Sequence, residues 1–563
     1  MRADAVIAYI CVGFCTLPSD FDRAMREASV GRTATDTDSH AFPYPHLTAN
    51  EGMTAALRKR MKQTTLKLTL LVALLLASLS ASAYDCCVDG IYYNLNKTAK
   101  TASVTFCDSR ESYNKEAYKD AVVIPETINN DGATYFVTSI GNNAFKGCSE
   151  LTSAAIPATV TSIGNYAFHK CSKLTSAAIP GSVTTIGSYA FSTCDRLSSM
   201  NIPNSVSSIG DHAFQFCRNL TAVNIPTSLT TISESAFRSC TGLTSVNIPN
   251  SVTSIGINAF YSCDKLTSVA IPNSVVQIGN FAFYGCQSLT SVAIPNSVVQ
   301  IGHSAFYGCQ SLTSVVIPAS VTSIMPDTFK KCRGLTSVEI PNSVTDISAS
   351  AFEDCEGLTS VDIPNSVTFI GRLAFGGCTG LTSVTIPNSV TTLFGAFYGC
   401  TGLTSVVYNA KRCSIPWGSV FDGCINITTL TIGEEVTMLP NDLFSGCEGL
   451  TSVTIPNSVT SIGPRTFYEC KGLTSIDIPN SVTSIGSDAF YKCTGLKELV
   501  VGDGVEEIGL TAFYGCTAMS KLVSTAAVPP TCGSLAFDGI DKQTCELLVI
   551  KESIDKYKSA EQW

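Results

Sequence analysis

Hydrophobic residues recur along this chain with a period of 23 residues. The repeated pattern is L-x-x-V-x-I-P-x-x-V-x-x-I-G-x-x-A-F-x-x-C-x-x, with apolar residues at unit positions 1, 4, 6, 10, 13, 18 and 21. Units begin at this spacing from Leu151 to Leu381, and the neighbouring units 266–288 and 289–311 differ at only two residues. Such a fixed period predicts one structural turn per unit, with the seven apolar side chains on its inside.

The unit 243–265 shows which elements the pattern predicts. Segment 243–248 is short and rich in β-branched residues, which favours a strand, and the proline at unit position 7 ends it because proline lacks an N–H for the ladder. Segment 251–256 is predicted as a second short extended piece. In segment 258–263, Phe260 and Cys263 are three residues apart, so one helical turn would place both on its inner face.

A single unit cannot bury its own apolar side, but stacked units share a continuous core. We therefore predict an α/β-type repeat solenoid that is mostly β, with parallel strands in register and one short helical turn per coil. The sixteen units that begin between Leu151 and Leu496 would extend over ~75–80 Å at a strand spacing of ~4.8 Å.

A secretory signal peptide is predicted at residues 61–83. Lysines open this segment, residues 68–79 form its apolar run, and small residues precede an expected cleavage after Ala83, which would export the protein to the cell surface or beyond. A retained signal anchor is the alternative, but the run is shorter than the roughly 20 residues of a membrane span. Since signal peptides begin proteins, residues 1–60 are a doubtful extension and translation is expected to start at Met61.

The rest of the chain divides according to how well it keeps the repeat. The outermost coils of a solenoid need covering by atypical segments. We expect an N-terminal cap with a first partial repeat at 84–148, the solenoid at 149–518 and a C-terminal cap at 519–563.

Charge and motif content exclude several classes of function. The net charge is −9 and the few lysines and arginines are scattered, so no nucleic-acid partner is expected. The sequence has no H-E-x-x-H, G-x-S-x-G or glycine-rich phosphate loop, and its histidines do not cluster, so we predict no enzyme, metal or cofactor. His169, His212 and His303 are interpreted as solvated surface residues.

The string LTSVTIPNSVTSIG followed by AFYGC strongly resembles the BspA-type leucine-rich repeats, and the likeness extends from about Val122 to Ala518. The resemblance implies a leucine-rich-repeat solenoid on a cell surface, acting as an adhesin without enzymatic activity. Its partners would be host, matrix or neighbouring-cell proteins or glycans. One departure is that Ser251 or its equivalent stands where the commonest leucine-rich repeats carry an asparagine ladder.

Cysteine recurs at unit position 21, every 23 residues from Cys148 to Cys378 and then irregularly to Cys516. An exported protein can form disulfides, but leucine-rich repeats place an apolar residue here and a free cysteine behaves as a small buried hydrophobe. We therefore favour buried thiols in this row. For the cap cysteines, disulfides and free thiols remain equal alternatives: Cys86, Cys87, Cys107, Cys532 and Cys545.

Unit position 5 is outward and varies from coil to coil, whereas positions 2 and 3 are almost always Thr-Ser. Variation at one exposed position suits a recognition surface, and it equally suits neutral drift. The polar candidates for ligand binding in this row are Asn201, Asn224, Asn247, Glu339, Asp362 and Asp477.

A tyrosine follows the repeat's phenylalanine in several units, among them Tyr261, Tyr284 and Tyr307. Tyrosine supplies rigid amphipathic contact area and is enriched at interfaces, so this row is a second candidate for ligand binding. The alternative is that each ring packs on the helical turn of the neighbouring coil.

The register changes once, in the segment VVYNAKRCSIPWGSVFDGC, where one unit is a residue short and the next a residue long. Tyr408, Lys411, Arg412 and Trp417 occur there, and a distorted loop is a natural place for function. A purely structural role is the alternative.

These patterns favour a non-enzymatic, secreted or surface-displayed protein whose long face binds protein or glycan. The alternative is a structural spacer or a self-associating surface-layer component without a specific ligand. In either reading no membrane span is expected in the mature chain.

Overall fold

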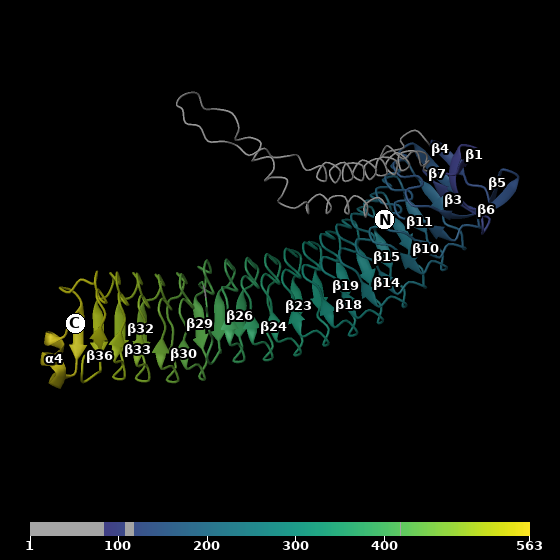
Figure 1. Ribbon diagram of the computed structural model, residues 1–563. Helices are drawn as coiled ribbons and strands as arrows, with labels where there is room; N and C mark the ends of the chain where they lie inside the picture. The colour runs from purple at the N-terminus through teal and green to yellow at the C-terminus, as the bar shows by residue number, and fades with distance from the viewer. Residues whose placement is uncertain (1–83, 107–117, 417) are drawn as a thin grey trace, which may run out of the picture. The chain divides into compact units, whose positions relative to one another are not determined.

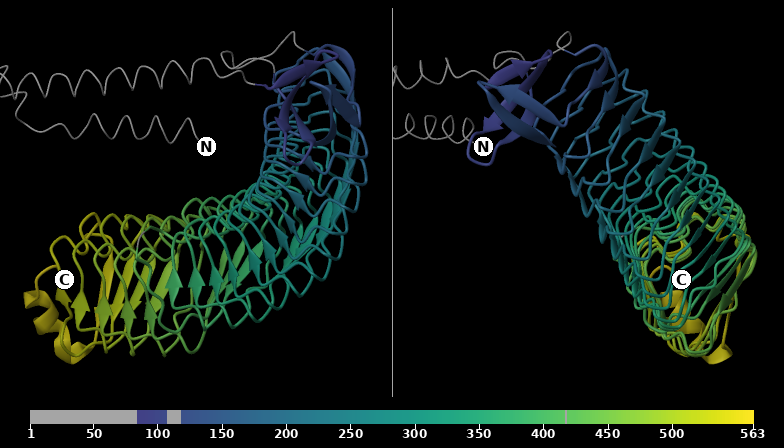
Figure 2. Two further views of the ribbon diagram at one scale, coloured as in Figure 1. Left: turned by 45° about the vertical axis from the view of Figure 1, so that its right-hand side comes forward. Right: turned by 90° about the vertical axis from the view of Figure 1, so that its right-hand side faces the viewer.

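The chain folds as a stack of coils, as the repeat predicts. The computed structural model describes residues 84–106, 118–416 and 418–563, so the predicted signal peptide and the extension before it lie outside the described residues. Each coil lies beside the one before it in the chain, as the gradual change of colour in Figure 1 shows, and the two views of Figure 2 show the same order. The predicted solenoid, built mostly of β-structure, is confirmed.

The seven unit positions predicted to point inward are buried. In the unit 243–265 none of these side chains is more than 6% exposed, and the same pattern holds in the neighbouring units. Ala259, at unit position 17, is also fully buried, which the prediction did not include. The buried residues of this unit at the predicted positions are Leu243, Val246, Ile248, Val252, Ile255, Phe260 and Cys263.

In most coils the first strand pairs in parallel with its equivalent in the next coil. These strands form four hydrogen-bonded sheets in chain order, β4 to β9, β11 to β23, β26 to β29 and β32 to β38. We call their outward side, which carries unit positions 3 and 5, the strand face. The strands are β4 (Asp120–Val123), β7 (Leu151–Ala155), β9 (Ser176–Ala178), β11 (Ser199–Asn201), β13 (Ala222–Asn224), β15 (Ser245–Asn247), β17 (Ser268–Ala270), β19 (Ser291–Ala293), β21 (Ser314–Val316), β23 (Ser337–Glu339), β26 (Ser383–Ile386), β28 (Ser405–Tyr408), β29 (Thr429–Ile432), β32 (Ser475–Ile478), β34 (Glu498–Val501), β36 (Lys521–Ser524) and β38 (Glu546–Val549).

A second series of strands runs along another side of the coils, and nearly all of them are two residues long. They too pair in parallel and in register, for example Ser254 with Gln277 and Ile255 with Ile278. The strands are β6 (Ala133–Ile140), β8 (Ser162–Ile163), β10 (Thr185–Ile186), β12 (Ser208–Ile209), β14 (Thr231–Ile232), β16 (Ser254–Ile255), β18 (Gln277–Ile278), β20 (Gln300–Ile301), β22 (Ser323–Ile324), β24 (Asp346–Ile347), β25 (Phe369–Ile370), β27 (Thr392–Leu393), β30 (Met438–Leu439), β31 (Ser461–Ile462), β33 (Ser484–Ile485), β35 (Glu507–Ile508) and β37 (Thr531–Cys532).

The helical turn predicted for each coil is wrong. Segment 258–263 forms consecutive turns, and Asn258 and Ser262 adopt left-handed backbone angles with φ of 55° and 51°. The N–H of Phe260 donates to the carbonyl of Ala282 in the next coil at 2.8 Å, whereas a helix would direct it four residues back in its own coil. The side chains of Phe260 and Cys263 nevertheless both point inward. We call the outward side of these turns the turn face.

The core phenylalanines stack from coil to coil along the solenoid. Neighbouring rings from Phe145 to Phe537 lie nearly parallel, with centroids between 4.9 and 5.8 Å apart. Because aromatic pairs add about 0.5–1.5 kcal/mol beyond the burial of their area, every coil is stabilised by both of its neighbours.

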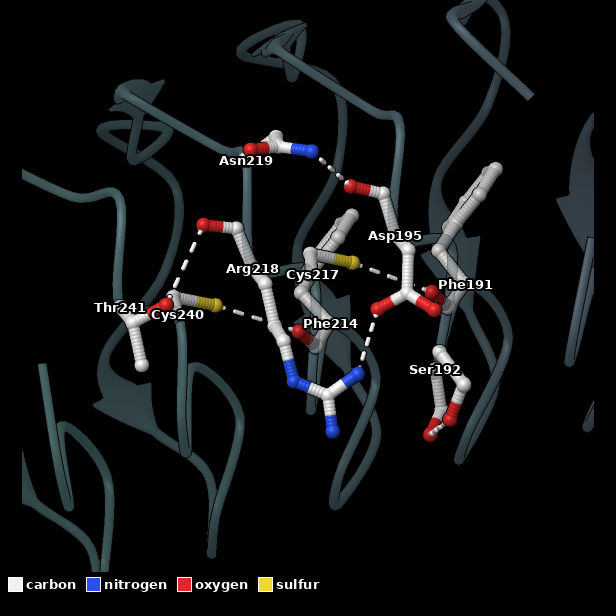
Figure 3. Close-up of polar contacts among 10 residues, drawn as sticks. Phe191, Ser192, Asp195, Phe214, Cys217, Arg218, Asn219, Cys240 and Thr241 are labelled. Atoms are coloured by element: carbon white, nitrogen blue, oxygen red, sulfur yellow. Dashed lines mark hydrogen bonds and ion pairs between the residues drawn. The ribbon is translucent and has the colours of Figure 1, made fainter. Parts of the chain in front are cut away.

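Polar side chains also connect the coils. The row cysteines from Cys171 to Cys516, apart from Cys447, each donate the S–H to the carbonyl of the phenylalanine in the preceding coil, at 3.0–3.3 Å. Figure 3 shows two of these bonds, from Cys217 to Phe191 and from Cys240 to Phe214. Serines at unit position 9, such as Ser274, donate to the carbonyl at unit position 10 of the preceding coil. The serine and cysteine rows thus make the bonds between coils that an asparagine ladder would make.

The ends of the described chain depart from the repeat. At the N-terminal end, β1 (Cys86–Val88), β2 (Ile91–Asn96) and β3 (Thr101–Thr105) pair antiparallel, while β5 (Thr127–Asn130) pairs antiparallel with β6. At the C-terminal end, a 3-10 turn η1 (Lys551–Ser553) leads into α4 (Ile554–Ser559). Tyr557 of α4 is buried, and its hydroxyl forms hydrogen bonds with Ser524 and with the carbonyl of Ala526.

Candidate functional site

The six polar candidates at unit position 5 are all exposed. Asn201 pairs with Asn224 and Asn224 with Asn247, so their side chains form one row across three coils of the strand face. Ala270 continues this row in register.

The acidic candidates lie further along the strand face. Glu339 ends β23, where it pairs with Val316, and Asp477 in β32 pairs with Val500. Asp362 lies in a coil whose first segment has no regular strand, between β23 and β26. The polar row therefore changes from amides to carboxylates and is not continuous.

The tyrosine row is a stack of rings. The Tyr261 and Tyr284 rings are 4.6 Å apart, and those of Tyr284 and Tyr307 are 4.5 Å apart, with interplanar angles of 1° and 7°. The Arg238 guanidinium lies 4.5 Å from the centroid of Tyr261, and the Lys331 ammonium lies 5.7 Å from that of Tyr307. Burial raises the pKa of Tyr284 to about 12. Each ring thus packs on the next coil, as the alternative raised from the sequence expected, although the turn that carries it is not helical.

The four residues predicted to gather at the register change are not all at the surface. Tyr408 is fully buried, because it pairs with Ile386 at the inward unit position 6 and packs edge-on against Phe444. Its place on an exposed loop was therefore predicted wrongly. Lys411 and Arg412 are exposed, whereas Trp417 lies outside the described residues.

Two of the histidines are not the solvated surface residues expected from the sequence. The rings of Tyr166, Tyr189 and His212 form a continuous stack, with centroids 4.8 and 4.4 Å apart, and His169 lies edge-on to Tyr166 at 5.5 Å. Burial lowers the pKa of His169 to about 4. His303 is exposed, as expected.

The cysteine row consists of buried free thiols, which confirms the favoured interpretation. Burial raises the pKa of most of these thiols, for example to about 12 for Cys286, and thiols with a raised pKa are poor nucleophiles and poor metal ligands. The cap cysteines Cys86, Cys87, Cys532 and Cys545 are also free, and Cys107 lies outside the described residues.

No group of three or more histidine, cysteine or acidic side chains in residues 84–106, 118–416 and 418–563 is arranged to hold a metal ion. In the same residues no helix is both long and apolar enough to cross a bilayer.

A family model of the BspA type leucine rich repeat region matches residues 138–267, 253–379, 322–448 and 415–539. None of the curated proteins compared with the chain matches it.

Among solved structures, a leucine-rich repeat protein from Bacteroides ovatus is 29% identical, with 83% of this chain and 100% of that chain covered and a TM-score of 0.49. A leucine rich cell surface protein from Faecalibacterium prausnitzii is 27% identical, with 63% and 96% covered and a TM-score of 0.45.

The family matches overlap and together extend from residue 138 to residue 539, over most of the stacked coils. This chain belongs to the family of BspA-type leucine-rich repeat proteins.

Proposed function

We propose that this protein is a non-enzymatic, exported binding protein, adhesin-like in action, whose strand face recognises proteins on another cell or in the surrounding matrix. The observation that carries the proposal is the row of exposed, variable side chains at unit position 5, held in register on rigid parallel sheets. The family membership supports a role in protein binding, and the cell-surface description of the Faecalibacterium prausnitzii protein supports display outside the cell.

The strand face suits recognition because its backbone is fixed while its outermost side chains differ. The row passes from amides at Asn201, Asn224 and Asn247 to carboxylates at Glu339 and Asp362, so different stretches of the strand face present different chemistry to a partner. Many weak contacts along a rigid surface can add up to a useful affinity. Because the side chains are already held in place by the sheet, each contact costs little conformational entropy.

Binding to matrix proteins and to whole cells tests this proposal. The purified protein should bind saturably, and replacing Asn201, Asn224 and Asn247 together by alanine should weaken binding at least tenfold. The fold should tolerate the change because alanine stands naturally at Ala270 and Ala293, in the same row. A matched control replaces the exposed Gln277 and Gln300 of the second strand series by alanine and should bind as the parent does.

The proposal is wrong if the protein binds neither matrix proteins nor cells, or if the triple alanine variant binds with the same affinity as the parent. Absence of any saturable binding would favour the structural spacer. Higher salt should weaken any contact that depends on Glu339 and Asp362, because exposed charges are screened.

A further inference from the structure

A hollow of about 460 Å3 opens on the turn face where the repeat changes its length. Its walls come from four successive coils, at the turns that follow β24, β25 and β27 and on both sides of Phe421. This volume lies within the roughly 300–1,000 Å3 typical of small-ligand sites. The side chains that line it include Asp354, Arg372, Tyr398 and Asp422.

Two changes in the sequence produce the hollow. Gly376 stands directly after the core phenylalanine, at the place that Tyr284 and Tyr307 occupy in regular coils. The two units before it carry Lys330 and Glu353 there, and Gly376 carries no side chain at all. The next unit is one residue short, because Leu381 and Leu403 are separated by 22 residues. The missing side chain and the shortened turn leave space between Asp354 on one side and Tyr398 on the other.

Gly377 keeps one wall of the hollow open. Its φ is +67°, and a Cβ there would lie 2.5 Å from Oδ1 of Asp354, so a larger residue would displace that carboxylate. The neighbouring Gly399 also has a positive φ, and a Cβ there would meet no atom within 4 Å. The glycines therefore expose polar groups that side chains would otherwise cover.

Tyr398 provides a flat apolar surface at the hollow. Its side chain is 53% exposed, and within the described residues no other aromatic ring packs on it, unlike Tyr284, which lies between two rings. A free tyrosine face beside hydrogen-bonding groups is the arrangement that suits a sugar ring, whose C–H face packs on the aromatic ring while its hydroxyls reach the polar wall.

The charges around the hollow select among ligands. Lys330 pairs with Glu353 at 2.8 Å and so neutralises one lining carboxylate. Arg372 offsets one of the two remaining carboxylates, Asp354 and Asp422, which leaves a weakly negative lining. An acidic sugar would be repelled, whereas the hydroxyl and amide groups of a neutral sugar can donate to the carboxylates and accept from Arg372.

We infer that this hollow binds a neutral or N-acetylated saccharide of one to two rings, stacked on Tyr398 and hydrogen-bonded by Asp354, Asp422 and Arg372. The inference goes beyond the proposed protein-binding function, because the hollow lies on the turn face and the proposed protein-binding row lies on the strand face. Either idea can fail while the other stands.

Saturation-transfer NMR and calorimetry with lactose, N,N′-diacetylchitobiose and 3′-sialyllactose test the inference on the full chain. At least one of the two neutral probes should bind, and 3′-sialyllactose should bind more weakly than lactose. Tyr398→Ala should weaken binding at least tenfold, and Asp422→Asn should weaken it severalfold. Tyr491→Ala is the matched control, since it removes a ring from an intact row far along the chain, and it should bind the probes as the parent does.

Filling the hollow gives a second, independent test. Gly376→Tyr introduces the tyrosine that the regular coils of residues 243–311 carry at this position, and it should abolish saccharide binding. The variant should fold because Phe281 and Tyr284 already place two large side chains at the equivalent positions of a regular coil, with centroids 6.0 Å apart. Binding of none of the probes, binding undiminished in Gly376→Tyr, or tighter binding of pentalysine than of either neutral sugar would overturn the inference.

Discussion

The regular coils between Leu243 and Leu312 and the irregular pair between Leu381 and Ile427 share one core but differ at the surface. The core phenylalanines are spaced alike in both, since the rings of Phe260 and Phe283 and those of Phe397 and Phe421 are each 5.4 Å apart. On the turn face, however, the regular coils present a closed stack of tyrosines, whereas the irregular pair leaves Tyr398 exposed beside a hollow.

This difference shows which contacts the solenoid requires. The cysteine of the long unit, Cys424, still donates to the carbonyl of Phe397, although 27 residues now separate them instead of 26. The extra and missing residues are absorbed in the turns, which face solvent. The buried rows therefore fix the stack, and the outer rows are free to change.

The largest expected effect comes from removing a core ring. Phe283→Ala should destabilise its coils by about 3–5 kcal/mol, because a fully buried ring between two others is lost and a cavity remains. Hydrogen exchange should show faster exchange in the neighbouring coils than at the two ends. Phe397→Ala should cost a similar amount, and uniform protection after either change would contradict the stacking.

Replacing a tyrosine should destabilise the regular coils more than the irregular pair. Tyr284→Ala removes two ring contacts and should cost about 1–3 kcal/mol, whereas Tyr398→Ala should change stability by less than about 0.5 kcal/mol. Urea denaturation of the two variants beside the parent measures both. Equal costs would mean that Tyr398 has packing contacts comparable to those of the regular row.

Cysteine substitutions should have a smaller effect. Cys286→Ala removes a bond of 3.3 Å to the carbonyl of Phe260 and should cost about 1 kcal/mol. In the parent, a thiol reagent should label Cys413 before Cys286, because Cys413 lies outside the row and bonds only weakly to the carbonyl of its neighbour Ser414, at 3.6 Å. Mass spectrometry after timed labelling measures the order, and the reverse order would show that the row opens first.

The smallest expected effect is on pH dependence. Since the pKa of His169 is lowered to about 4 in the folded chain, against about 6.5 when unfolded, folding favours the neutral imidazole. Its contribution is present above pH 6.5 and is lost as the pH falls towards 4. NMR titration should place the His169 midpoint near 4, and His169→Asn should flatten the stability profile between those values. A midpoint near 6.5 would contradict the burial.

The sequence predicted the inward side of each coil well because apolar spacing reports burial directly. It failed for segment 258–263, because a spacing of three residues suits both a helical turn and the observed pair of turns. What separates them is the left-handed backbone at Asn258 and Ser262, together with an N–H that finds its acceptor in the next coil. That acceptor belongs to another unit, so the local sequence does not reveal it.

The candidate sites were also predicted only in part, because they too depend on contacts between units. Tyr408 was chosen for its residue type, although its unit position 6 already indicated burial. The sequence does indicate the hollow, because Phe375 to Cys378 read FGGC where the next unit reads FYGC. The loss of a side chain becomes a cavity only when the coils on both sides leave the space unfilled, and that depends on the three-dimensional stack.

The cysteine bonds and ring contacts between coils have a genetic consequence. Because every unit presents the same pair of faces to its neighbours, unequal crossing-over within the near-identical segments 266–288 and 289–311 would insert or delete a whole coil and leave both junctions matched. Alleles of different length should therefore arise readily and fold, so selection can lengthen or shorten this protein without redesigning its interior.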